Sequence, residues 1–383
     1  SIDIAAFAVT TSLTTVTFGA GTSSLLTHPA CFAAHPALQS IVIPPGITSI
    51  DTGAFQQCSL LTSITFPGTS TLTAIPANCF NGTALASIEI PASVSSIDIA
   101  AFAVTTSLTT VTFAAGTSSL LALPANCFDN HPVLQSIVLP PGMTSIDDYA
   151  LRACVSLTNV VISNTITTIG ESILNGSTAL TTITIPDNVT TIGQYTFSHC
   201  SSLNTVIFSG TSTITAMTRE MFKNCFNLTA ITIPPSVTSI GSQAFMGCKA
   251  LLSIIIPEAV IFIGPYAFSS CWKLPSIIIP AAVATIHTYA FWGCTLLTSV
   301  TFSGISTLNL IKFNCFESCT SLVNIDIPPT VTTLGIYTFY LCSSLSNITF
   351  SGISNLTAIP ANCFDLCTSL SGIIIPDSVT SIG

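Results

Sequence analysis

Fifteen cysteines are the residues of this 383-residue chain with the widest chemistry, because a thiol can act as a nucleophile, a disulfide partner or a zinc ligand. Five of them directly precede the phenylalanine of a recurring block, and ten follow that phenylalanine, or the leucine in its place, by three residues. No histidine accompanies them in a zinc-ligand pattern, and a free cysteine behaves as a small buried hydrophobe. The spacing therefore favours buried thiols without a metal, with Cys315–Cys319 and Cys363–Cys367 as the alternatives for local disulfides.

The histidines show no catalytic pattern. Nucleophilic catalysis needs a nucleophile, a base and an orienting acid that converge on one place. The histidines are scattered along the chain without a paired acid and nucleophile, at His28, His35, His131, His199 and His287. We therefore predict no catalytic residue, no cofactor and no enzymatic activity.

Six asparagines stand in Asn-x-Ser/Thr sequons, which accept an N-linked sugar in a secreted protein. They are Asn81, Asn175, Asn188, Asn227, Asn347 and Asn355. A chain rich in threonine also produces such sequons by chance, so each remains a candidate. Together they favour an extracellular, glycosylated protein.

Aromatic and basic side chains gather in one stretch of the chain. Five of the six basic residues lie between positions 219 and 312, and aromatic side chains beside lysine are common in binding patches. The candidates for a ligand patch are Tyr266, Trp272, Lys273, Tyr289 and Trp292. Solvated turns with incidental aromatic residues are the simpler interpretation, so both remain open.

All these residues are carried by one sequence unit that recurs about sixteen times. The unit contains an Ala-Phe-x-x-Cys block, and we name its phenylalanine, or the leucine that replaces it, the anchor residue. Successive anchors are 23 or 25 residues apart, with single intervals of 22 and 26. A fixed period of this length predicts a solenoid, in which each coil buries its apolar face by stacking on its neighbours. The anchors are Phe7, Phe32, Phe55, Phe80, Phe102, Phe128, Leu151, Leu174, Phe197, Phe222, Phe245, Phe268, Phe291, Phe316, Phe339 and Phe364.

Each coil has the pattern of two short extended segments followed by a turn. In one representative coil Leu251, Ile254 and Ile256 alternate inward as a strand, and Pro257 ends it because proline cannot donate to a strand ladder. A second extended segment follows, after which Gly264 is expected to supply a turn. The coil is therefore predicted to contain two short extended segments.

The pattern Leu-x-x-Ile-x-Ile-Pro, then Val-x-x-Ile-Gly, then Ala-Phe-x-x-Cys resembles the BspA-like leucine-rich repeat family across essentially the whole chain. The resemblance implies a repeat solenoid, a right-handed β-rich superhelix or arc of 22–26-residue coils with parallel strands on the concave side. Members of that family are mostly surface-exposed proteins with adhesive or binding roles. An extracellular or cell-surface location is therefore implied as well.

Composition narrows the possible partners. Charged residues make up 5% of the chain, its net charge is −9, and it has only six basic residues. Nucleic acid is therefore excluded as a partner, because phosphate binding needs clustered lysine and arginine. No stretch of about 18 apolar residues is uninterrupted, so we attribute the high hydropathy to the repeated core and predict no membrane insertion of this segment.

We predict one domain over residues 1–383, because a solenoid grows coil by coil. Residues 1–3 and 381–383 occupy the same place in the coil, without a polar cap. This pattern suggests a segment of a longer array, or copies that stack head to tail.

Our first hypothesis is a non-enzymatic extracellular structural protein, a scaffold or stalk that stacks end to end on copies of itself into a glycosylated surface filament. The alternative is a cell-surface adhesin that binds a protein or glycan ligand. It would use its concave strands or the aromatic and basic segment at 219–312.

Overall fold

The computed structural model describes residues 11–18, 27–28, 32–116 and 119–383, and these residues form strands and turns without a helix. The chain divides into two compact units, Ser1–Thr196 (unit 1) and Phe197–Gly383 (unit 2). Each unit is a solenoid of parallel strands, as predicted, and the two contain about 15 coils. That the whole chain is one continuous domain remains a prediction. The anchor Phe7 and Cys31 lie outside the described residues.

Each coil contributes one strand of two to four residues to a first series. In these strands buried and exposed residues alternate, because successive side chains point to opposite faces. In unit 1 the series is β1 (Thr15–Val16), β3 (Ser40–Val42), β5 (Ser63–Thr65), β7 (Ser87–Ile90), β9 (Thr110–Phe113), β11 (Ser136–Val138), β13 (Asn159–Val161) and β15 (Thr182–Ile185). In unit 2 it is β17 (Thr205–Phe208), β19 (Ala230–Thr232), β21 (Ser253–Ile255), β23 (Ser276–Ile279), β25 (Ser299–Phe302), β27 (Asn324–Ile327) and β29 (Asn347–Phe350).

A second series of two-residue strands lies just before the anchor turns. In unit 1 it is β2 (Thr27–His28), β4 (Ser49–Ile50), β6 (Ala74–Ile75), β8 (Ser96–Ile97), β10 (Ala122–Leu123), β12 (Ser145–Ile146), β14 (Thr168–Ile169) and β16 (Thr191–Ile192). In unit 2 it is β18 (Ala216–Met217), β20 (Ser239–Ile240), β22 (Phe262–Ile263), β24 (Thr285–Ile286), β26 (Leu310–Ile311), β28 (Thr333–Leu334), β30 (Ala358–Ile359) and β31 (Ser381–Ile382).

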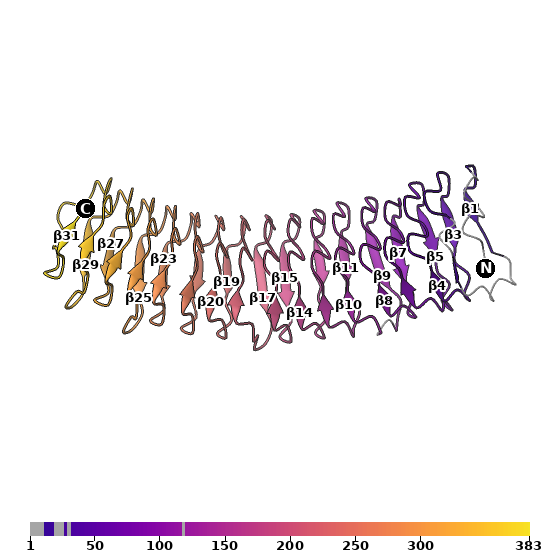
Figure 1. Ribbon diagram of the computed structural model, residues 1–383, viewed down its shortest axis with the longest axis horizontal. Helices are drawn as coiled ribbons and strands as arrows, with labels where there is room; N and C mark the ends of the chain where they lie inside the picture. The colour runs from indigo at the N-terminus through magenta and orange to yellow at the C-terminus, as the bar shows by residue number, and fades with distance from the viewer. Residues whose placement is uncertain (1–10, 19–26, 29–31, 117–118) are drawn as a thin grey trace. The chain divides into compact units, whose positions relative to one another are not determined.

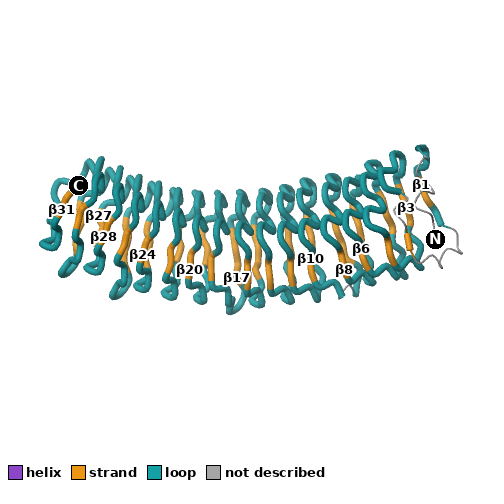
Figure 2. The backbone as a smooth tube through the Cα atoms, viewed as in Figure 1, coloured by secondary structure: helices purple, strands orange, loops and turns teal. Residues whose placement is uncertain are grey.

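Within each unit, the described strands pair in parallel with equivalent strands of neighbouring coils (Figures 1 and 2). In unit 1, β7 pairs with β9 so that Ile88 lies opposite Val111. In unit 2, β27 pairs with β29 so that Ile325 lies opposite Ile348. The register therefore advances by one coil at each step, and equivalent residues of successive coils lie above one another.

This register stacks the anchor rings into a column in each unit. In unit 1 the column runs from Phe32 to Phe128, and in unit 2 it runs from Phe197 to Phe364. Neighbouring anchor rings have centroids 5.2–5.9 Å apart. Two leucines, Leu151 and Leu174, replace the ring in the last described coils of unit 1 and are also buried. The columns form the centre of the core, because aromatic side chains bury the most apolar area.

The anchor turn owes its shape to two left-handed residues. We number positions in a coil from the anchor, so that position −2 lies two residues before it. Positions −2 and +2 both have a φ near +60° in every coil from anchor Phe55 to anchor Phe364, as at Tyr266 (56°) and Ser270 (58°). This conformation is costly for residues other than glycine, asparagine and aspartate.

The glycine of the Ile-Gly pair does not supply the turn that was predicted for it. Gly264 does not have a left-handed φ; instead, an added Cβ would lie 2.8 Å from the backbone nitrogen of Ser242 in the preceding coil. The glycine is needed because two coils approach closely there.

Threonine hydroxyls join the coils along their exposed edges. The Thr238 hydroxyl donates to the Thr215 carbonyl oxygen at 3.2 Å, and the Thr332 hydroxyl donates to the Asn309 carbonyl oxygen at the same distance. Threonine therefore satisfies surface carbonyl groups in a chain that has few charges.

Candidate binding surfaces

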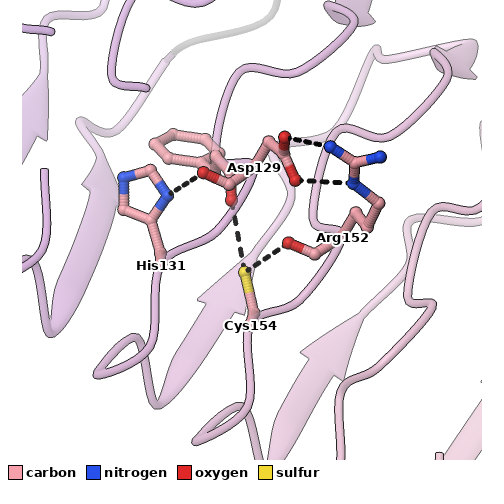
Figure 3. Close-up of polar contacts among 5 residues, drawn as sticks. Asp129, His131, Arg152 and Cys154 are labelled. Carbon is pink, nitrogen blue, oxygen red and sulfur yellow. Dashed lines mark hydrogen bonds and ion pairs between the residues drawn. The ribbon is translucent and has the colours of Figure 1, made fainter. Parts of the chain in front are cut away.

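Among the residues that the structure describes, an Asp–His–Cys cluster in unit 1 most resembles a catalytic site (Figure 3). His131 Nδ1 lies 3.2 Å from the backbone carbonyl oxygen of Asp129. The Asp129 carboxylate accepts hydrogen bonds from Arg152 Nε at 2.9 Å and Nη2 at 2.6 Å. The Cys154 thiol donates to the carbonyl oxygen of Phe128 at 3.3 Å. Each side chain thus has a structural partner.

The cluster lacks the chemistry of a nucleophile. Cys154 is fully buried, and burial raises its pKa to about 12, so the thiol stays protonated at neutral pH. Burial also lowers the pKa of His131, which keeps the ring neutral. The carboxylate that would orient a catalytic histidine is instead paired with Arg152. The four side chains join two coils and do not form a triad.

The other described thiols are buried as well. At position +3 the thiol donates to the anchor carbonyl oxygen of the preceding coil, as from Cys248 to Phe222 at 3.2 Å and from Cys294 to Phe268 at 3.1 Å. Burial raises the pKa of Cys294 to about 12. The described cysteines form no disulfide, including the Cys315–Cys319 and Cys363–Cys367 candidates. Within the same described ranges no cluster of His, Cys, Asp and Glu could hold a metal ion.

The predicted aromatic patch divides into two clusters, both in unit 2. Trp272 lies at position +4 of its coil, and Lys249 and Phe226 hold position +4 in the two preceding coils. Lys249 Nζ lies 4.7 Å from the centroid of the Phe226 ring and 4.2 Å from that of Trp272. The ammonium is therefore held by cation–π contacts between two rings that are two coils apart. Lys273 is exposed beside this cluster.

Tyr266, Tyr289 and Trp292 belong to the second cluster, which lines a groove of about 500 Å³. Tyr266 and Tyr289 both occupy position −2, and their rings stack with centroids 4.7 Å apart at an interplanar angle of 5°. Tyr337 holds the same position two coils after Tyr289, but the coil between them has Asn314 there. The tyrosine row is thus interrupted by one short side chain.

The other row of the groove comes from position +1 of the same coils, where Trp292, Glu317 and Tyr340 follow one another. The Glu317 carboxylate accepts a hydrogen bond from Asn314 Nδ2. Tyr337 and Tyr340 have ring centroids 5.3 Å apart at an angle of 84°. One amide–carboxylate pair therefore lies between aromatic side chains of the two neighbouring coils. We name this set of residues the aromatic groove.

The polar character of the aromatic groove is acidic. Burial, and then the neighbouring Tyr266 and Glu317, raise the pKa of Tyr289, so its hydroxyl stays protonated at neutral pH. None of the described residues that line the groove is basic. The groove therefore has one carboxylate among neutral side chains.

Sequence reasoning missed Asn314, Glu317, Tyr337 and Tyr340, although the signal was present. When coils are aligned by their anchors, these residues fall at positions −2 and +1, as do Tyr266, Tyr289 and Trp292. Trp272 falls at position +4 and was grouped with them only because it is near in sequence. Position within the coil, and not distance along the chain, decides which side chains meet.

The six glycosylation candidates fall into two groups by exposure. Asn81 and Asn175 are half-buried, and the hydroxyl residues that complete their sequons, Thr83 and Ser177, are buried. The other four asparagines are exposed, as are the threonines of their sequons: Asn188, Asn227, Asn347 and Asn355.

The outward positions of the first strand series carry threonine and aliphatic residues. In unit 2 Ile255 is 81% exposed, next to Thr232 in the paired strand. Asp326 and Thr349 continue the same face in β27 and β29, joined by a hydrogen bond of 2.6 Å. None of the described residues forms a helix long and apolar enough to cross a membrane.

Comparison with known structures places the fold among leucine-rich repeats. A leucine-rich repeat protein from Bacteroides ovatus has a TM-score of 0.70 and 24% identity, with 89% of this chain and 95% of that one covered. The pneumococcal vaccine antigen PcpA gives a TM-score of 0.48 and 18% identity, with 89% and 93% covered. No curated protein matches the sequence.

The family model described as a BspA type leucine rich repeat region matches residues 26–122, 121–228, 215–310 and 304–383. These ranges together extend from residue 26 to the last residue, and the coils of both units have the expected parallel strands. The chain belongs to the BspA-type leucine-rich repeat family.

Proposed function

We propose that this protein is a non-enzymatic cell-surface recognition scaffold whose ligand site is the aromatic groove of unit 2. The observation that carries the proposal is the convergence of five aromatic side chains around the Asn314–Glu317 pair. Aromatic walls with a few placed polar groups are typical of ligand sites. The coil itself does not require these rings, since position −2 holds Ala100 or Gln243 in other coils with the same backbone.

A surface location is supported by the family and by the composition. Threonine hydroxyls join the coils, and only 5% of the residues are charged. Four sequon asparagines are exposed. Labelling of intact cells with an antibody against the chain tests the location. Signal without permeabilisation supports it, and signal that requires permeabilisation contradicts it.

Binding is tested with the full chain, immobilised and screened against glycans, peptides and small organic cations. The Asn314→Tyr variant is screened in parallel, because a tyrosine there would fill the gap in the groove. The proposal expects at least one ligand that binds the wild-type chain and loses about tenfold or more in affinity for the variant. Equal binding of every ligand by the two proteins contradicts a role for the groove.

A surface filament is the second candidate, and it is favoured by the identical way in which coils contact one another. Anchor rings repeat at 5.3–5.6 Å in unit 2 from Phe197 to Phe339, so a coil surface is complementary to another copy of itself. Head-to-tail contacts of this kind give open filaments unless the rotation closes a ring. Native material viewed by electron microscopy as continuous fibres supports this candidate, and discrete particles at high concentration contradict it.

A further inference from the structure

The aromatic groove contains a slot of defined size. Position −2 holds a ring at Tyr266, Tyr289 and Tyr337, but it holds the shorter Asn314 between the last two. The Tyr266 and Tyr289 rings show how closely this position stacks when both coils supply a ring, at 4.7 Å. At position −2 the Asn314 coil therefore lacks the ring that would continue the row, and its Phe313 meets Tyr289 edge-to-face, with ring centroids 6.3 Å apart at 88°.

Unit 2 contains a second pair of rings that lie two coils apart, and there the space between them is filled. At position +4, Phe226 and Trp272 are two coils apart, and the coil between them supplies Lys249. The Lys249 ammonium lies within 5 Å of both ring centroids. Two aromatic side chains separated by one coil of this solenoid thus accept a cation between them.

The spacing of coils around the slot supports the same occupant. The core rings Phe291, Phe316 and Phe339 of these three coils are 5.3 and 5.6 Å apart. A group midway between Tyr289 and Tyr337 would be about 5–6 Å from each ring, within the roughly 6 Å at which cation–π attraction operates. Tyr340, at 84° to Tyr337, adds a perpendicular ring.

The charge of the site distinguishes a cation from a neutral ligand. Glu317 extends from the same coil as Asn314, and the amide of Asn314 holds its carboxylate in place. The aromatic faces carry negative electrostatic potential, and the described lining supplies no basic side chain that would compete with a cation.

We propose that the slot between Tyr289 and Tyr337 binds an organic cation, a quaternary ammonium or a guanidinium head group, which pairs with the Glu317 carboxylate. This inference rests on the proposed function, because it assigns a ligand class to the same groove. A quaternary ammonium would use only cation–π and charge contacts. A guanidinium would also donate hydrogen bonds to the carboxylate.

Calorimetric titration of the full chain tests the proposal with four probes. Choline represents the quaternary ammonium, N-acetyl-arginine amide represents the guanidinium, 3,3-dimethylbutanol is the neutral isostere of choline, and chitotetraose represents a neutral glycan. We expect one or both cations to bind and the neutral isostere to bind at least about tenfold more weakly. The tighter of the two cations identifies the source of the head group.

Three variants place binding in the slot. Glu317→Gln should weaken cation binding about tenfold or more while retaining the shape of the site. Asn314→Tyr should abolish it, and the change should fold, because Tyr266, Tyr289 and Tyr337 already occupy this left-handed position at φ of 56–57°. Asn126→Tyr is the matched control, since it makes the same change at position −2 in unit 1, at φ 55°.

The results separate the two proposals. If neither cation binds, or if the neutral isostere binds equally well, the cation assignment is wrong. If only chitotetraose binds and Asn314→Tyr abolishes that binding, the cation assignment fails but the groove remains a recognition site. Cation binding that survives both Asn314→Tyr and Glu317→Gln overturns the location as well.

Discussion

Single positions in the coil decide which side chains can carry function. A residue at position +3 is buried. The Cys248 thiol donates to the anchor carbonyl oxygen of the preceding coil, and the Thr105 hydroxyl donates to the anchor carbonyl oxygen of its own coil, so cysteine and threonine there are structural. A residue at position −2 has a left-handed backbone and is half-buried in most coils, and the chain holds residues as different as Ala100, Gln243 and Tyr266 there on the same backbone. Chemistry that the sequence suggests at Cys154 is therefore suppressed by burial, whereas the variable position −2 is available for binding.

His131 should make stability depend on pH. Burial holds its pKa below the usual value of about 6.5, so the unfolded chain takes up a proton before the folded one does. Stability is fully present above about pH 7 and decreases as the pH falls through 6.5 toward the lowered folded pKa. We expect the melting temperature of His131→Cys to decrease less than that of the wild type between about pH 7.5 and pH 5.5. Equal decreases would show that His131 does not contribute.

Glycan occupancy should follow exposure of the sequon. In a glycosylating secretory host, Asn188, Asn227 and Asn355 should carry sugar, because both the asparagine and the hydroxyl residue of each sequon are exposed. Asn81 should be largely unoccupied, because it is half-buried and the Thr83 of its sequon is buried. Glycopeptide mass spectrometry measures occupancy, and full occupancy of Asn81 would contradict this expectation.

At the scale of the element, stability comes from the contact of each coil with the next. Short strands, stacked anchor rings and hydroxyl-to-carbonyl bonds all connect a coil to its neighbours and not to distant parts of the chain. A substitution should therefore act through the one or two interfaces that it touches.

Replacing an anchor ring should be costly in proportion to the volume lost. Phe268 is fully buried between Phe245 and Phe291, at 5.4 and 5.3 Å. We expect Phe268→Ala to destabilise the chain by about 3–5 kcal/mol. Phe268→Leu should cost less than about 1.5 kcal/mol, since Leu151 and Leu174 fill the same position. Urea titration followed by circular dichroism measures both, and similar costs for the two variants would argue against the ring column as the source of stability.

The Ile-Gly position should reject even one methyl group. Gly264→Ala brings a Cβ to 2.8 Å from the Ser242 backbone nitrogen, and backbone cannot move aside as a side chain can. We expect a loss of about 2–3 kcal/mol in the same urea titration. Gly68→Ala is the control, because nothing lies within 4 Å of a Cβ there, and its effect should stay within about 0.5 kcal/mol. A harmless Gly264→Ala would mean that the coils do not approach as closely as the structure has them.

The scale of the element is also where sequence reasoning was most accurate. The period placed the anchors, and the alternation of Leu251, Ile254 and Ile256 placed β21 and its buried side chains. The role of Gly264 was misread as a turn, because close approach between coils has no signature within one coil. The left-handed backbone of the tyrosines was not foreseen either. Tyr266 adopts this conformation although tyrosine, unlike glycine, rarely does.

At the scale of the whole molecule, the family and the parallel-strand solenoid were predictable and are confirmed. The aromatic groove was predicted only in part. Its residues lie in four successive coils, and the intervals between the anchors of these coils decide which side chains align. Tyr289 and Tyr337 are far apart in sequence and meet across Asn314 only after the coils are stacked. Surface location, glycosylation and filament formation remain predictions.

The measurement that tests the account most directly is a crystal structure of the full chain soaked with choline, compared with that of the Asn314→Tyr variant treated in the same way. The account predicts density for the ammonium between Tyr289 and Tyr337, near the Glu317 carboxylate, in the wild type alone. A wild-type slot without density at saturating choline, or density of equal strength in the variant, would contradict it.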